Sequence, residues 1–216
     1  MPSSHIARVR IGAALVAAVA SATVVAGCGS GEPARFGGVP QSCARLLAPA
    51  VAEIRAFAGA LYTEGDFEQP QTAAATDPDR PSRACGGAYP QRPVAAPAPG
   101  AALSRIVSVV FAVQRGDDPV AGAAKYLDVA AGSAEGVRGH EVGDESYSGT
   151  PPFAETGAVQ IGFRVSNAVV TVSVVGTDAP LREGGAPEPV PTAELSTVAT
   201  GIARTLAADL DSVLPG

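Results

Sequence analysis

The sequence contains few of the residues on which common binding and catalytic chemistries depend. Among its 216 residues there is no Trp, one Met, one Lys (Lys125), two His and three Cys. Fifteen basic residues face 21 acidic ones, which gives a net charge of −6, and the basic residues form no cluster. Nucleic-acid binding and electrostatic docking on anionic lipid both require a basic surface. We therefore expect neither of them.

Several catalytic and cofactor motifs are also missing. The sequence has no G-x-S-x-G elbow and no S-x-x-K sequence, which carry the nucleophile in two large classes of serine enzyme. A zinc site usually requires three or four Cys, His or carboxylate ligands. Asp77-Pro78-Asp79 lacks the glycine and the closing glutamate of a calcium loop. The sequence accordingly predicts no metal and no cofactor.

A short apolar run is present at the N-terminus. Arg8 and Arg10 precede an uncharged stretch, Ile11 to Val25, that is rich in Ala and Val. This order is typical of a secretory signal. The run is shorter than the roughly 20 residues that a membrane-spanning helix needs, which favours a signal peptide over a permanent span.

The end of that run suggests a lipid anchor. Val25-Ala26-Gly27-Cys28 resembles the lipobox of bacterial lipoproteins. That resemblance implies a diacylglycerol thioether on Cys28, cleavage before Cys28, and attachment of the protein to the outer face of the cell membrane through its N-terminal lipid. Two or three acyl chains bind a bilayer far more firmly than one. The alternatives are an ordinary signal peptide or a buried Cys in an apolar helix.

We therefore divide the chain into a signal peptide (1–27), a lipidated Cys with a flexible Gly- and Pro-rich tether (28–41) and an extracytoplasmic domain (42–216). Removal of residues 1–27 leaves 189 residues, enough for one domain, with 13 basic and 21 acidic side chains and a net charge of −8. Such a chain has two cysteines besides Cys28, and an oxidising compartment favours a Cys43–Cys85 disulfide. Two separate buried thiols are the alternative.

Hydrophobic periodicity predicts three helices and three strands. Apolar stripes indicate helices from about Ala48 to Tyr62, from Pro119 to Ala131 with Asp118 as N-cap, and from Thr192, the expected N-cap, to Val213. A strand buried on both faces, or nearly so, is expected within the run LSRIVSVVFAVQRG, residues 103–116. A hairpin is expected at 158–176, with Asn167 left-handed in its turn. The fold class is therefore α+β, a small antiparallel sheet packed by about three helices.

The remaining segments are expected to be loops. Two of them, Glu64–Gly100 and Thr177–Pro191, are Pro-rich, and Ser133–Glu155 is expected to be irregular. Within the latter lies GHEVGDESYSG, which contains the only His of the mature chain. We expect this segment and the Ser166-Asn167 turn to border a shallow groove for a ligand or partner, with the Pro-rich loops as its rim.

The order of these parts resembles a known group. SCARLLAPAVAEI, RACGGAYP, GHEVGDESYSG and VSNAVVTVSVVG, followed by an amphipathic helix, are similar to actinobacterial lipoproteins of unknown function. They are more distantly similar to the extracellular sensor domain of actinobacterial Ser/Thr protein kinases. The resemblance implies a Cys-paired α+β domain between about Ser42 and Leu214, and it assigns no activity. Gly86-Gly87-Ala88 stands where relatives often have an aromatic residue, and Trp is absent.

Two functions remain for the domain. The first is a non-catalytic binding or accessory module at the cell envelope, with His140, Glu141, Asp144 and Glu145 as candidate ligand-binding residues. The second is a cell-envelope hydrolase whose site is not readable from the sequence, for which Ser148, His140 and Asp144 are conceivable members. Since no paired catalytic groups stand out, the sequence favours the binding module, and we expect no enzymatic activity.

Overall fold

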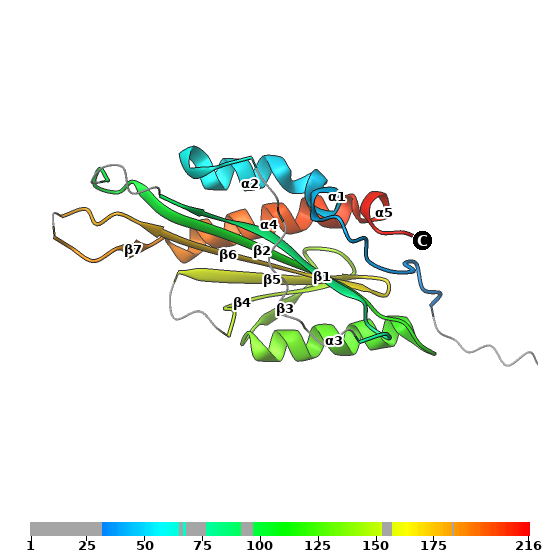
Figure 1. The fold of residues 1–216 in the computed structure, drawn as a ribbon. Coiled ribbons are helices and arrows are strands. Elements are labelled where there is room, and N and C mark those ends of the chain that lie inside the picture. Colours follow the sequence, from blue (N-terminus) through cyan, green and yellow to red (C-terminus); the bar gives the residue numbers. More distant parts are fainter. Residues whose placement is uncertain (1–31, 65–66, 68–76, 92–96, 153–156, 183) are drawn as a thin grey trace, which may run out of the picture. The chain divides into compact units, whose positions relative to one another are not determined.

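Antiparallel strands form one sheet with helices on both of its faces (Figure 1). The computed structural model describes residues 32–64, 67, 77–91, 97–152, 157–182 and 184–216. The expected signal peptide (1–27) and the expected lipid acceptor Cys28 lie outside these residues. The predicted α+β class, with helices packed on an antiparallel sheet, is confirmed.

The sheet is built around two long central strands. The order across it is β1-β2-β6-β5-β4-β3, and β7 pairs with the far end of β6. Every pairing is antiparallel. The strands span β1 Ser82–Pro90, β2 Ala102–Val113, β3 Val137–Gly139, β4 Glu145–Gly149, β5 Ala158–Val165, β6 Ala168–Asp178 and β7 Glu188–Pro189.

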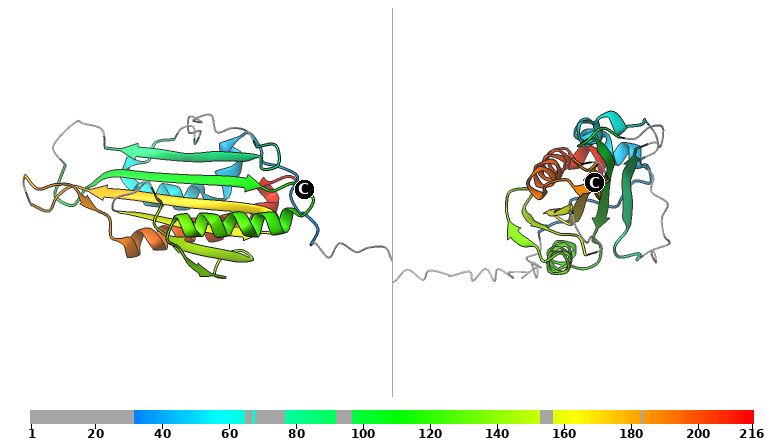
Figure 2. Two further views of the ribbon diagram at one scale, coloured as in Figure 1. Left: turned by 90° about the horizontal axis from the view of Figure 1, so that it is seen from below. Right: turned by 90° about the vertical axis from the view of Figure 1, so that its left-hand side faces the viewer.

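The helices form two unequal layers. One face of the sheet carries α1 (Cys43–Leu47), α2 (Val51–Ala58), α4 (Thr192–Ala208) and α5 (Leu210–Val213). In the described part of the chain, the other face carries α3 (Pro119–Ser133) alone, and this helix lies along one side of the sheet (Figure 2). The two faces are therefore covered to different extents.

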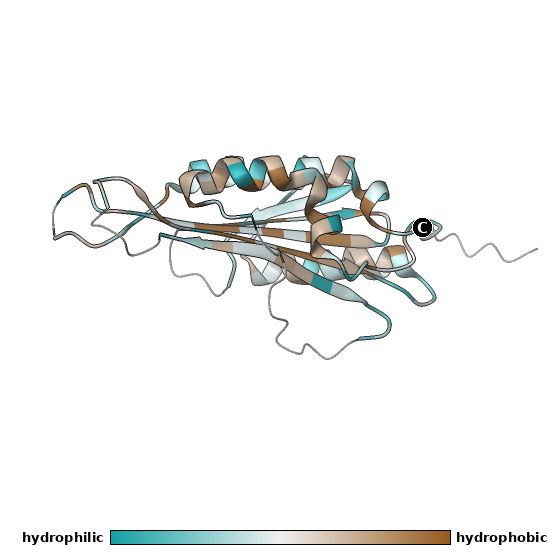
Figure 3. Cartoon of the chain, turned by 45° about the horizontal axis from the view of Figure 1, so that its top comes forward, coloured by the Kyte–Doolittle hydropathy of each residue, from teal (hydrophilic) through white to brown (hydrophobic). Residues whose placement is uncertain are grey.

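The main hydrophobic core lies between the sheet and the larger helix layer. Its side chains come from alternate positions of the central strands and from one stripe of α4, and they are almost fully buried: Val107, Val109, Phe111, Phe163, Val170, Val172, Val174, Leu195, Ile202 and Leu206. Brown segments run along the central strands in Figure 3. A second, smaller cluster joins α3 to Tyr147 and Val169. The sheet is therefore held from both sides, but chiefly by α4.

The strand at 102–113 differs from expectation in its burial. Val107, Val109 and Phe111 are fully buried on the α4 side, whereas Ile106 and Val110 on the opposite side are only half-buried. The expectation of burial on both faces was wrong, because α3 contacts β4, β5 and β6 but leaves the β1–β2 side of that face open.

Three strands lie in segments that we expected to be loops. β1 falls within the Pro-rich stretch Glu64–Gly100, and β3 and β4 fall within Ser133–Glu155. All three are rich in Gly, Ser or charged residues, so their hydrophobic pattern is weak. β1 and β4 form because a longer neighbour offers a complete row of backbone partners: β1 pairs with β2 over nine residues, and β4 pairs with β5 over five. β3 in turn pairs with β4 over three residues.

Smaller differences concern the ends of helices and the hairpin turn. The helix predicted from about Ala48 to Tyr62 is α2 with a 3-10 turn on either side, Ala48–Ala50, which contains Pro49, and Gly59–Leu61; α1 precedes the predicted range. Thr192 is the first residue of α4 rather than its N-cap, which is Pro191. In the β5–β6 turn the left-handed residue is Ser166, with φ +50°, and not Asn167. Asn167 instead uses its side chain to hold neighbouring chain segments.

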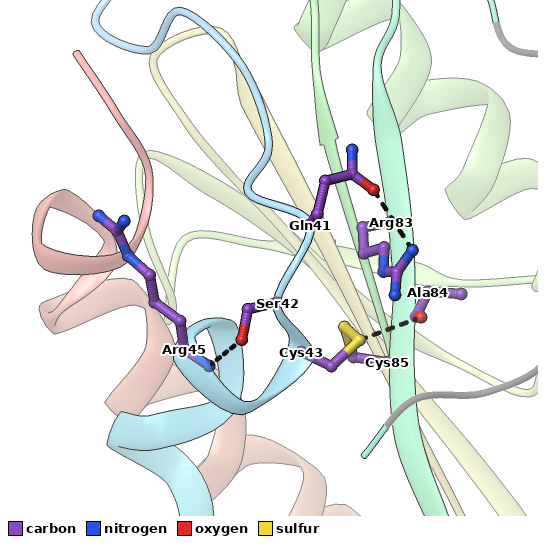
Figure 4. The surroundings of a disulfide bond; sticks show 7 residues. All are labelled: Gln41, Ser42, Cys43, Arg45, Arg83, Ala84 and Cys85. Carbon is purple, nitrogen blue, oxygen red and sulfur yellow. Dashed lines mark hydrogen bonds between the residues drawn. A yellow bond between two sulfur atoms is a disulfide. The ribbon is translucent and has the colours of Figure 1, made fainter. Parts of the chain in front are cut away.

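The predicted disulfide is confirmed. Cys43, the first residue of α1, is bonded to Cys85 on the edge strand β1, with the two α-carbons 5.3 Å apart (Figure 4). Both residues are fully buried. Ser42 caps the same helix, its hydroxyl oxygen accepting from the Arg45 amide at 3.3 Å. The bond therefore fastens the start of the helix layer to the outermost strand.

The segment expected to be a tether is partly bound to the domain. Phe36 is 4% exposed and belongs to the main core. The side-chain oxygen of Asn167 accepts from the amides of Arg35 and Phe36, both at 3.0 Å, and the Gly37 amide donates to the Pro215 carbonyl at 2.9 Å. The expectation of a free tether up to Gln41 was therefore wrong from Arg35 onward, because these backbone groups find partners on the sheet.

Candidate functional site

The four candidate ligand-binding residues lie in and beside the loop that joins β3 to β4. The expected proximity of this loop to the β5–β6 turn is present: a carboxylate oxygen of Asp144 accepts from the Ser166 amide at 2.7 Å. The Pro-rich segment 177–191 begins at the opposite end of β6 from this turn. It therefore does not rim a groove shared with the turn, and that part of the hypothesis was wrong.

Two of the four candidates serve as counter-ions for a buried arginine. The Arg164 side chain is only 10% exposed and donates to Asp144 at 3.3 Å, to Glu145 at 2.9 Å and to the Ser166 carbonyl at 3.0 Å. A buried guanidinium is costly unless such partners surround it. Glu145 also accepts from Arg138 at 3.1 Å. The geometry therefore uses Asp144 and Glu145 to stabilise the turn and the two strands.

The hydrolytic trio does not form. The His140 ring nitrogen Nδ1 lies 3.0 Å from the main-chain oxygen of Asp144. The Asp144 carboxylate is engaged by Ser166 and Arg164, as described above. In a triad the carboxylate must orient the imidazole, and here the two residues meet through the backbone.

Of the four candidates, Asp144 lines a pocket of about 310 Å³ with Ser166 and residues 32–35, and Glu141 lines a cavity beside the β3–β4 hairpin. The Glu141 carboxylate is 3.7 Å from the Arg204 guanidinium, and both side chains are exposed, so this ion pair contributes little stability. The cavity is a groove of about 260 Å³ between the β3–β4 hairpin and α4. It is lined by Val137, Arg138, Gly139, Glu141, Val142, Ser146, Tyr147, Ser148, Ile161, Ser196 and Thr200.

Strand periodicity and helix geometry together make this groove polar. Ser146 and Ser148 are alternate residues of β4 and share a face, while Tyr147 between them packs against α3 on the other face. Ser196 and Thr200 are four residues apart on α4 and share one side of that helix. Four hydroxyl groups therefore converge from two elements, with Arg138 and Glu141 adding one charge of each sign.

A second cavity, of about 320 Å³, lies between α2 and α4. One of its lining residues is a buried arginine, Arg105, whose side chain is 10% exposed and forms an ion pair with Asp178 at 2.6 Å. The guanidinium also donates to the carbonyls of Ser104 and Thr177 and lies 5.5 Å from the centre of the Phe57 ring. Most of the Arg105 donors are thus already used within the fold.

Sequence reasoning missed most of the hydroxyl-lined groove. Arg138, Ser196 and Thr200 carried no motif, and β3 was not expected to be a strand. One signal was available: in ESYSG the polar residues alternate with a single Tyr, which is the pattern of a half-buried strand. The four-residue spacing of Ser196 and Thr200 predicts that they share one side of a helix, but it does not predict which part of the fold that side contacts.

Comparison with known proteins gives no family for this chain. No protein-family model, no curated protein and no solved structure matches it. Within the described ranges, no helix is long and apolar enough to cross a membrane, and no group of three or more His, Cys, Asp or Glu side chains is placed to hold a metal ion.

Proposed function

We propose that this chain is a lipoprotein anchored to the outer face of the cell membrane through Cys28, with a non-catalytic binding module as its folded domain. The support for the anchor is the N-terminal order of arginines, short apolar run and Val25-Ala26-Gly27-Cys28. The Cys43–Cys85 bond agrees with an oxidising compartment outside the cytoplasm.

The observation that carries the binding role is the convergence of four hydroxyl groups in the groove between β4 and α4. A hydroxyl both donates and accepts, so Ser146, Ser148, Ser196 and Thr200 offer matched partners to a ligand that itself carries hydroxyls. The side chains of Val142 and Ile161 add an apolar surface to the lining of the groove. Such a mixture suits a sugar unit, which has hydroxyl edges and an apolar ring face.

The size of the groove limits what it can hold. Its volume of about 260 Å³ lies slightly below the range of roughly 300–1,000 Å³ that is usual for small-molecule sites. A single unit of a longer polymer therefore fits better than a large free ligand. We accordingly assign the glycan part of the cell wall as the ligand class.

The anchor is tested by mass spectrometry of the N-terminal peptide from detergent-extracted protein. We expect the parent to begin at Cys28 with acyl chains attached, and the Cys28→Ser variant to lack them and to lose membrane retention. An unacylated parent, or equal retention of the variant, contradicts the lipoprotein assignment.

The groove is tested with purified cell-wall fragments in a sedimentation assay. We expect Ser148→Val and Thr200→Val to reduce co-sedimentation about tenfold, since a lost buried polar contact costs on the order of 1–3 kcal/mol. Ser133→Ala, at the exposed end of α3, is the matched control and should bind as the parent does. If the parent does not co-sediment, or if all variants bind equally, the groove is not a glycan site.

A further inference from the structure

The described contacts at the start of the domain limit the distance that the chain can span between Cys28 and the sheet. We use the name N-terminal clamp for Arg35, Phe36 and Gly37 together with their partners Asn167, Gln114, Arg115 and Pro215. Asn167 is 1% exposed, accepts from two backbone amides of the clamp, and donates to the carbonyls of Phe36 and Gln114, both at 2.8 Å.

Additional contacts reinforce the clamp. The Arg115 side chain donates to the Gly37 carbonyl at 3.1 Å, and Arg35 forms an ion pair with Asp211. The Phe36 side chain is buried in the main core. A segment held by backbone bonds on both sides and by a buried aromatic ring does not slide, so the contacts of the domain with this segment begin no later than Arg35, and the Ser166 hydroxyl also donates to the Pro33 carbonyl at 3.4 Å.

Every partner of the clamp lies at one end of the sheet. Gln114 directly follows β2, Asn167 directly precedes β6, and Pro215 follows α5. The register pairs Val113 with Ala168 at this end and Ala102 with Asp178 at the other. Eleven residue steps of β2 separate the two ends, which corresponds to about 37 Å.

Chain length then limits the distance between the lipid and this end of the sheet. Seven residue steps join Cys28 to Arg35, and a fully extended chain covers at most about 25 Å over that number. If the domain instead began after Gln41, the thirteen residue steps from Cys28 to Gln41 would allow roughly 45 Å. The short reach is a consequence of the clamp and could not be inferred from the composition of the segment.

We propose that the end of the sheet with the Ser166-Asn167 turn faces the membrane, and that the β6–β7 end points away from it. The proposal rests on the lipid anchor proposed above. The chain from Cys28 onward has a net charge of −8, which disfavours adhesion of the domain itself to an anionic bilayer, so the short connection to the lipid decides which end lies near the membrane. The β6–β7 end, where Leu181 is 66% exposed, is thereby presented to partners beyond the membrane surface.

Energy transfer to the bilayer tests this orientation. A single Cys is introduced at Asp117, which is exposed after β2, or at Arg182, which is exposed beyond β6, and each is labelled with a donor dye. The acylated full chain is placed in phosphatidylcholine vesicles that carry an acceptor dye on the lipid headgroup. We expect clearly higher transfer from position 117 than from position 182.

A tether variant is the matched control. Insertion of about 20 Gly and Ser residues between Gly31 and Glu32 raises the typical reach to roughly 30 Å, and the difference between the two positions should be largely lost. Equal transfer from both positions in the acylated parent, or higher transfer from position 182, overturns the orientation alone. A parent that carries no acyl chain overturns both the orientation and the proposed anchor.

Discussion

Tyr147 shows how single residues determine the packing of the β3–β4 hairpin. Its ring lies between Gly136 and Gly162, and a β-carbon added at either glycine would overlap ring atoms. The hydroxyl accepts from the side-chain amide of Gln160 at 2.7 Å. The two glycines are therefore required for close approach, and the ring in turn fixes β4 against β5 and α3.

Substitution of these glycines tests that account. Gly162→Ala should lower the free energy of unfolding by about 1–3 kcal/mol, because the fully buried ring has no room to move. Gly132→Ala on α3, where nothing lies within 4 Å of the added carbon, should instead raise it by roughly 0.5–1 kcal/mol. Urea denaturation measures both. Equal effects of the two substitutions would contradict the packing described for Tyr147.

The same tyrosine makes stability sensitive to alkaline pH. Burial raises the pKa of Tyr147 above its usual value of about 10, because the charged phenolate is poorly solvated in the fold. The unfolded chain releases this proton first, so the contribution is complete below about pH 10 and is lost as the pH rises through the folded pKa. Burial also raises the pKa of Tyr89. Tyr147→Phe should therefore flatten, but not abolish, the decline in unfolding free energy above about pH 10. Identical declines in parent and variant would argue against a buried phenol.

At the scale of elements, Arg164 connects β5 to the loop before β4. Arg164→Ala should cost about 1–3 kcal/mol, since it leaves Asp144 and Glu145 without their main partner while both remain partly solvated. Backbone hydrogen exchange should accelerate in residues 137–149 and change little in β2. Arg204→Ala, which removes only an exposed 3.7 Å pair with Glu141, is the control and should leave exchange unchanged. Unchanged exchange in both variants would mean that Arg164 does not hold the hairpin.

The disulfide joins two elements that are 42 residues apart in the sequence. On the chain-entropy model a loop of this length contributes about 4 kcal/mol. The double variant Cys43→Ala, Cys85→Ala should therefore lower the unfolding free energy by roughly 2–5 kcal/mol and weaken β1 first, because among the described strands β1 pairs with β2 alone. A thiol assay on the denatured, unreduced mature protein should detect neither cysteine. Two reactive thiols there would contradict the bond.

The sequence predicted the elements whose apolar residues repeat with a clear period. β2, β5, β6, α3 and α4 were expected close to their observed bounds, because each buries a regular row of Val, Leu or Ala. β1, β3 and β4 were not expected, because their stability comes from backbone pairing with a neighbour. The same holds for the candidate site. The sequence predicted that the segment with Asp144 lies near the turn with Ser166, but it did not predict the hydroxyl-lined groove, because that groove depends on how α4 lies beside β4.

At the scale of the whole molecule, charge distinguishes the proposed lipid anchor from the protein surface as a source of membrane affinity. The mature chain carries a net charge of −8, so a Cys28→Ser form expressed without residues 1–27 should not bind anionic vesicles even at low ionic strength. Co-flotation with vesicles measures this, and the acylated parent is the control. Binding of the unacylated form that weakens with added salt would reveal a basic surface and contradict the account.

The N-terminal clamp also has a consequence for the order of events as the protein matures. Phe36 and Gly37 are bonded to Asn167 and Pro215, which are made more than a hundred residues later. The clamp therefore closes only after nearly all of the domain has been synthesised and folded. If Cys28 carries the proposed lipid, residues from Arg35 onward are not yet clamped when the lipid is attached, and folding afterwards brings the domain closer to the proposed anchor.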